Sequence, residues 1–231
     1  MINVIDIGIV LLLIMFIIIG FKRGVIKEIV SLVGIILVFV LSWSLKNILG
    51  NFLCIIFPFF EFVGPLNGMS SLNVLVYQII AFMIVFCLLL CLYTVSLKIS
   101  RVVQKIVNMT IILWIPSKIL GAIVSFIKGY LLIMIVFIML VVPFGDFELF
   151  NDSIIMNYML YETPVVSVYT HNFMDSVRKI YDLSSKLTYD SIDVNEANRE
   201  AIEIMIESNI TNKETINDLI DMGKIENIDK F

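Results

Sequence analysis

The stretch IDIGIVLLLIMFIIIGFKRGVIKEIVSLVGIILVFVLSWSL, residues 5–45, decides the class of this protein. It contains two apolar runs, residues 5–21 and 29–45, separated by a short basic link. A helix of roughly 20 apolar residues crosses the bilayer core, because each residue advances a helix by about 1.5 Å. We therefore expect each run to form a transmembrane helix.

The remainder of the chain extends this pattern. Hydrophobic residues make up 60% of the 231 residues and charged residues 16%, and the mean hydropathy is +1.01. Soluble domains are about 45–50% apolar and about 25% charged, so this composition excludes a soluble globular protein. Two further runs, residues 74–97 and 119–142, are long enough to cross the membrane. The sequence therefore predicts an all-α integral membrane protein with a four-helix transmembrane bundle.

Charge divides the chain into two regions. Residues 1–142 hold nine Lys and Arg against three acids, whereas residues 143–231 hold seven against seventeen. We therefore expect a transmembrane domain over residues 1–145 and an acidic helical tail over residues 146–231. An acidic tail of this kind argues against nucleic acid as a partner.

The basic links predict the orientation. Lys and Arg in short loops are retained on the cytoplasmic side, and the links after the first and third helices are both basic. Four crossings then place the N-terminus and the tail outside. Residues 48–66 are a competing fifth crossing that would turn the tail inward. Because they contain Pro58, Glu61 and Pro65, we favour an interfacial or re-entrant segment.

Residues 98–113 show a second kind of pattern. Apolar positions recur at helical spacing, and Lys98, Arg101 and Lys105 occupy the opposite face. We expect a cytoplasmic amphipathic helix on the inner leaflet, whose basic side chains bind anionic lipid. Packing of its apolar face on the transmembrane helices is an equally good interpretation and does not exclude the first.

The tail carries signals for short helices. Pro164 suits the start of a helix that continues to about Lys186. Asp193 with Glu196, and Thr211 with Glu214, resemble reciprocal N-terminal caps, and Gly223 suits the end of the last helix.

Few side chains suggest catalysis or metal binding. Cys87 and Cys91 lie one turn apart, but two thiolates in lipid would be uncompensated charges, so apolar packing is the favoured interpretation. The single histidine, His171, has no accompanying nucleophile motif, and we interpret it as a surface residue. The sequence contains no G-x-S-x-G elbow, phosphate loop or H-E-x-x-H motif. We predict no enzymatic activity, no metal and no cofactor.

Small residues recur every four positions in two expected helices. Gly20 and Gly24 lie at the inner end of the first, and Gly121, Ser125 and Gly129 lie in the fourth. This spacing allows helix backbones to approach closely, so it predicts a packing seam.

Lys128 lies inside the fourth helix, where an ammonium group must either reach the membrane surface or find an anion. We expect its side chain to extend to the inner surface. A buried ion pair with Glu28 or Asp6, or a role in permeation, is the alternative interpretation.

The first 45 residues also carry a polar frame, N-x-x-D followed by G-F-x-R-G-x-x-K-E-x-x-S-L-x-G, from Asn3 to Gly34. This frame resembles the colicin V production (CvpA) family of bacterial membrane proteins. The run from Ser117 to Gly129 is similar to the stretch that opens that family's last helix, although Ser125 stands where relatives often have glycine. The resemblance extends to about residue 145.

The resemblance implies four transmembrane helices, an amphipathic cytoplasmic helix before the fourth, and residence in the bacterial inner membrane. It also implies a role in producing or exporting a secreted peptide toxin and in envelope homeostasis. Some relatives carry an extracytoplasmic serine protease, which this tail cannot supply. The family-motif and packing residues are then Asp6, Gly20, Arg23, Gly24, Lys27, Glu28, Gly34, Gly121, Ser125, Lys128 and Gly129.

Two functions are compatible with these patterns. The first is a non-catalytic scaffold or accessory factor that binds an envelope protein or a second copy of itself. The second is a small homo-oligomeric channel or transporter, with Lys128 and the small-residue seam lining a path. The third helix has polar residues only near its ends, which favours the scaffold.

Overall fold

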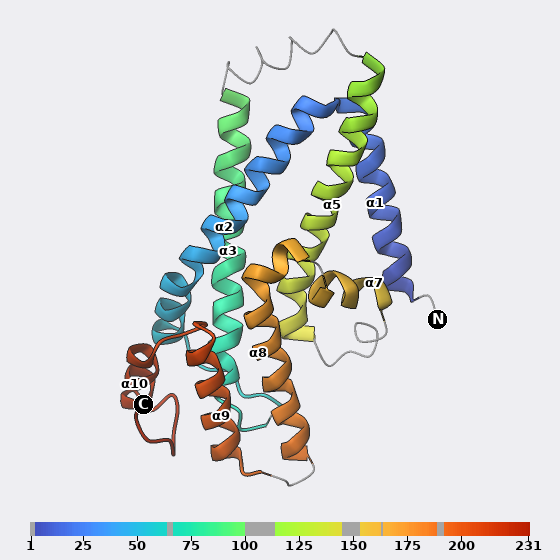
Figure 1. The fold of residues 1–231 in the computed structure, drawn as a ribbon. Helices are drawn as coiled ribbons and strands as arrows, with labels where there is room; N and C mark the ends of the chain where they lie inside the picture. Colours follow the sequence, from blue (N-terminus) through green and yellow to red (C-terminus); the bar gives the residue numbers. More distant parts are fainter. Residues whose placement is uncertain (1–2, 64–66, 100–113, 145–152, 163, 189–191) are drawn as a thin grey trace. The chain divides into compact units, whose positions relative to one another are not determined.

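The computed structural model describes residues 3–63, 67–99, 114–144, 153–162, 164–188 and 192–231. This part of the chain is helical and contains no strand, which confirms the predicted all-α class. The elements in chain order are α1 (Val4–Arg23), α2 (Val25–Ile56), α3 (Leu72–Ile99), α5 (Trp114–Phe144), α7 (Ile154–Asn157), a π-helical turn (Tyr158–Glu162), α8 (Pro164–Thr188), α9 (Val194–Glu207) and α10 (Lys213–Asp221) (Figure 1).

Four of the described helices are long and apolar enough to cross a membrane: α1, α2, α3 and α5. This confirms the four predicted spans. Each helix extends past the bounds expected from its apolar run, because the backbone hydrogen bonds that define a helix do not require apolar side chains. The predicted amphipathic helix over residues 98–113 lies outside the described residues, apart from the last two residues of α3.

Residues 48–66 do not form a membrane-length helix of their own within the described part of the chain. Their first nine residues continue α2, and residues 57–63 follow as a non-helical segment. Pro58 explains the end of α2, because proline lacks a backbone donor and disfavours helical geometry in the residue before it. At 32 residues and about 1.5 Å per residue, α2 is about 48 Å long, more than the bilayer core requires.

The described chain forms two compact units. The first contains residues 1–44 and 84–160, and the second contains residues 45–83 and 161–231. Both α2 and α3 contribute one end to each unit. The division expected at about residue 145 stays a prediction.

In the first unit, α1 and α5 lie side by side along their lengths, and α7 contacts α1 (Figure 1). The ring of Tyr93 on α3 lies against Gly34 on α2, where an added Cβ would overlap it. Its hydroxyl donates a hydrogen bond to the Val30 carbonyl at 2.9 Å. These contacts join α1 to α5 and α2 to α3.

In the second unit, the tail helices pack on the end of α2 and the start of α3. Asn198 on α9 donates to the Gly68 carbonyl at 2.9 Å and accepts from the Ser71 amide at 2.9 Å. Lys46 lies within α2 and is buried, with its ammonium 5.8 Å from the Phe173 ring centroid. The aromatic segment after α2 is fixed on α3, because Tyr77 contacts three of its rings, those of Phe57, Phe59 and Phe60.

The start and end signals of the tail helices are mostly confirmed. Pro164 is the first residue of α8, Asp193 caps α9, and Gly223 follows α10 with a φ of 67°. The predicted cap of α10 is wrong by one residue. Asn212, and not Thr211, is the N-cap, because its side chain accepts from the Thr215 amide at 2.8 Å.

Candidate functional site

The turn between α1 and α2 depends on glycine. Gly24 has a φ of 81°, a conformation that other residues adopt only with strain. Its amide donates to the Gly20 carbonyl at 3.0 Å and so closes the end of α1. Ser117 on α5 accepts a hydrogen bond from the Val25 amide at 3.4 Å. The turn thus reverses the chain and holds the start of α2 beside the start of α5.

The small residues of α1 and α5 face one another. A Cβ added at Gly20 would overlap the Gly121 carbonyl oxygen and the Cβ of Ser125, and one added at Gly121 would lie 2.7 Å from the Gly20 carbonyl oxygen. One turn after Ser125, Gly129 lies against the ring of Phe16. The two backbones are therefore in direct contact, as the spacing of these residues predicts.

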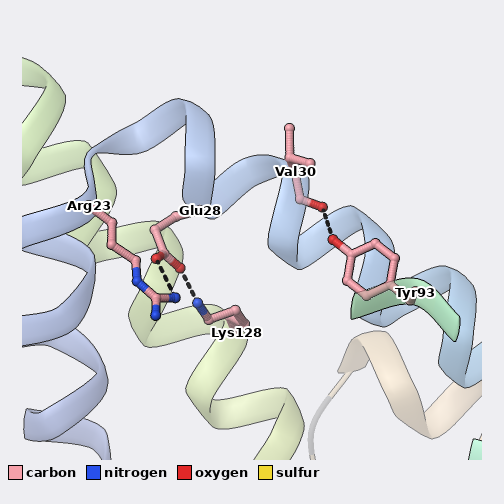
Figure 2. A network of polar contacts seen from close by, with 5 residues as sticks. All are labelled: Arg23, Glu28, Val30, Tyr93 and Lys128. Carbon is pink, nitrogen blue, oxygen red and sulfur yellow. Dashed lines mark hydrogen bonds and ion pairs between the residues drawn. The ribbon is translucent and has the colours of Figure 1, made fainter. Parts of the chain in front are cut away.

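A buried ion pair lies beside this seam. The Lys128 ammonium donates to the Glu28 carboxylate, and the two residues are 3% and 0% exposed (Figure 2). The Arg23 guanidinium lies 3.7 Å from the second Glu28 oxygen. The expectation that Lys128 extends to the surface is wrong. The turn at Gly24 brings a carboxylate within reach, and pairing inside an apolar environment replaces the water that the charge would otherwise need.

Asp6, the other anion considered for Lys128, has different partners. Its carboxylate accepts from the Ser153 hydroxyl at 2.6 Å and from the Ile155 amide at 3.1 Å. It also accepts from the Asn3 amide at 3.2 Å. Asp6 therefore connects the start of α1 to the start of α7, where a carboxylate is favourable because helix N-termini carry unpaired amide groups.

The sequence that contains these residues matches a known family. Residues 5–164, more than half of the chain, match the family model described as colicin V production protein. The chain belongs to this family. No curated protein and no solved structure matches the chain in the comparisons. The family match and the four membrane-length helices together identify a multi-pass membrane protein of the colicin V production family.

The motif residues of this colicin V production family member fall into distinct positions. Gly20, Gly24 and Gly121 make the seam and the turn, and Glu28 and Lys128 make the ion pair. The side chain of Lys27 is exposed. Lys98 belongs to α3, whereas Arg101 and Lys105 lie outside the described residues.

Three contacting residues were missed by sequence reasoning: Tyr93, Ser117 and Ser153. Each is a single polar residue whose partner lies more than 60 positions away. Ser153 carries one recognisable signal, because serine before a short apolar run is a common N-cap. Tyr93 and Ser117 carry no local signal that distinguishes them from other polar residues in long helices.

Proposed function

We propose that this protein is a non-catalytic scaffold or accessory factor in peptide-toxin production or export and in envelope homeostasis. The chain would reside in the bacterial inner membrane with both ends outside. Its partner would be an envelope protein or a second copy of the chain. Family membership supports the process, and the basic links of the sequence support the orientation.

The main observation behind this proposal is that two charged side chains within the long helices bind one another. Lys128 and Glu28 are almost completely buried and bind one another, so neither is presented to a solute. The adjacent seam brings two helix backbones into contact and leaves no space for a path between them. A pore needs polar groups along a water-filled passage, whereas a rigid scaffold needs internally satisfied helices.

A charge-exchange experiment separates the scaffold from the channel. The Glu28→Lys/Lys128→Glu double variant keeps an ion pair, whereas Lys128→Met and Glu28→Gln break it. For a scaffold we expect toxin export and partner crosslinking to fall in both single variants and to recover in the double variant. We also expect liposomes that contain the wild-type protein to pass ions no faster than protein-free liposomes.

The opposite result would identify a channel. If wild-type protein conducts ions, and Lys128→Met alters that flux while crosslinked partners are retained, the scaffold proposal is wrong. Exposed Lys179→Met is the matched control, because it removes one cation from the surface of α8 without touching the ion pair.

The proposed orientation has its own test. In a variant without native cysteines, Asp229→Cys is expected to react with a membrane-impermeant maleimide in intact cells, after removal of the outer membrane where one is present. Lys27→Cys should react only after permeabilisation. Both positions are exposed in the structure, whereas native Cys54 is buried and unsuitable for labelling. Labelling of Lys27→Cys in intact cells would reverse the assignment of inside and outside.

A further inference from the structure

Four cations from three helices gather where α1, α2 and α5 meet. Lys22 and Arg23 end α1, Lys27 lies in the first turn of α2, and Lys118 lies near the start of α5. The hydrogen bond from the Val25 amide to Ser117 holds these segments together. We call this group of four side chains the basic corner.

Acids are scarce in the stretches of chain that form the basic corner. Residues 7–44 and 84–142 contain a single acid, Glu28. That carboxylate is fully buried and bound to Lys128, which removes most of its compensating effect on the corner. Lys22 and Lys27 are exposed, and neither has a hydrogen bond or ion pair within the described residues. Lys22 and Lys27 therefore present positive charge that no acid among the described residues binds.

Exposed apolar side chains lie directly beside these cations. Phe21, Ile29, Ile119 and Leu120 are between 45% and 53% exposed, and each is within two residues of a member of the corner. The Lys118 ammonium lies 5.7 Å from the Phe21 ring centroid, which places a cation at the edge of an apolar surface. This surface is complementary to an anionic phospholipid, because it offers cations to the charged headgroup and apolar side chains to the hydrocarbon chains.

We propose that the basic corner is a binding site for one anionic glycerophospholipid. Ammonium groups of Lys22, Lys27 and Lys118 would contact the phosphate and the anionic headgroup. The acyl chains would lie along the exposed apolar residues of α1 and α5. Free phosphate would satisfy the cations equally well, but only a lipid would contact the cations and the adjoining apolar surface with one molecule.

This inference does not depend on the scaffold proposal or on residues 98–113. It requires only that α1, α2 and α5 cross the membrane with these ends at the headgroup level, on whichever side of the membrane they lie. Basic residues at this level are attracted to anionic lipid, and the attraction adds up over neighbouring cations.

The test uses full-length protein in a neutral detergent with defined lipid added. Native mass spectrometry would count bound phosphatidylglycerol and phosphatidylcholine on the wild type and on the Lys22→Gln/Lys27→Gln/Lys118→Gln variant. We expect the wild type to prefer phosphatidylglycerol and the variant to bind it at least about tenfold more weakly. Arg23 is left unchanged because it contacts Glu28.

The matched control removes the same charge elsewhere. Lys179→Gln/Lys186→Gln/Lys213→Gln changes three exposed cations of α8 and α10 and should bind phosphatidylglycerol like the wild type. Equal losses in both variants would show a net-charge effect and overturn the proposal. Unchanged preference in the basic-corner variant would do the same.

Two further measurements complete the test. Displacement of bound phosphatidylglycerol by inorganic phosphate at equal concentration would identify a general anion site and overturn the lipid assignment. If circular dichroism shows that the triple variant loses helix, Lys27→Gln is compared with Lys179→Gln instead. A selective loss of phosphatidylglycerol in Lys27→Gln would then support the site, and equal binding by the two would refute it.

Discussion

Lys128 and Glu28 depend on one another because both are buried. Removing one partner of a buried pair leaves an uncompensated charge, which typically costs about 3–5 kcal/mol, whereas replacing both partners by neutral groups is often tolerated. The contribution of the pair is therefore visible only when single and double variants are compared.

We predict that Glu28→Gln and Lys128→Met each lower the free energy of unfolding by about 3–5 kcal/mol. The Glu28→Gln/Lys128→Met double variant should lose clearly less than the sum of the two. Equilibrium unfolding in mixed detergent would measure all three. Glu203→Gln is the control, because it breaks an exposed pair with Arg199 that contributes less than about 1 kcal/mol. Strict additivity would contradict the prediction.

Gly121 is required by the space available and not by its backbone conformation. We predict that Gly121→Ala destabilises the protein by about 1–3 kcal/mol, because the new Cβ would meet the backbone of Gly20 and Gly24. Gly8→Ala is the control within α1, since nothing lies within 4 Å of an added Cβ there. Thermal unfolding in detergent would compare them. Similar losses in both variants would argue against the seam.

At the scale of the helix, the end of α2 is closed by a side chain from the tail. The Lys224 ammonium donates to the carbonyls of Cys54, Ile55 and Phe57 at 2.7, 2.6 and 2.8 Å. Carbonyl groups in the last turn of a helix have no partner within it, and a cation there also matches the negative end of the helix dipole. Lys224 therefore acts as the C-terminal cap of α2, although it lies far from α2 in the sequence.

We predict that Lys224→Met loosens the end of α2, because three carbonyls lose a charged donor at a cost of about 1–3 kcal/mol. Hydrogen–deuterium exchange of residues 50–57 should become faster. Lys230→Met is the control, because its ammonium binds the exposed carboxylate of Asp221 and not the backbone carbonyls at the end of α2. If exchange at residues 50–57 is the same in both variants, Lys224 does not cap α2.

At the scale of the whole molecule, distant parts of the chain are joined through single polar side chains. Asn198 connects α9 to the residues before α3, and its amide satisfies two backbone groups 127 and 130 positions away. Residues 161–231 consequently form one compact unit with the end of α2 and the start of α3.

We predict that Asn198→Ala exposes the turn before α3, because the Gly68 carbonyl and the Ser71 amide lose their partner. The expected cost is about 1–3 kcal/mol, with faster hydrogen–deuterium exchange at residues 68–73. Asn195→Ala, at an exposed position of the same helix, should leave exchange there unchanged. Equal exchange in the two variants would show that Asn198 does not hold the tail in place.

Local features of the sequence predicted the helices well. Apolar runs identified all four spans, and the tail signals at Pro164, Asp193 and Gly223 fell at helix ends. The α10 cap lies at Asn212 and not at Thr211, which agrees with the stronger preference for asparagine than for threonine at the N-cap. Thr211 instead lies 3.5 Å from the Asn51 side chain, a contact that no local pattern indicates.

The sequence by itself determined the class of the protein, its four membrane-length helices, its family and the set of anions available to Lys128. These features follow from composition and from the local spacing of residues, so they can be recognised without knowing how the helices pack. Only the tertiary structure decided that Glu28 takes Lys128, that Asp6 takes Ser153, and that Lys224 closes α2. These partners are 100 or more positions apart, and turns such as the one at Gly24 bring them together. A charge in an apolar interior needs a counter-charge, so the turns determine which partner it binds.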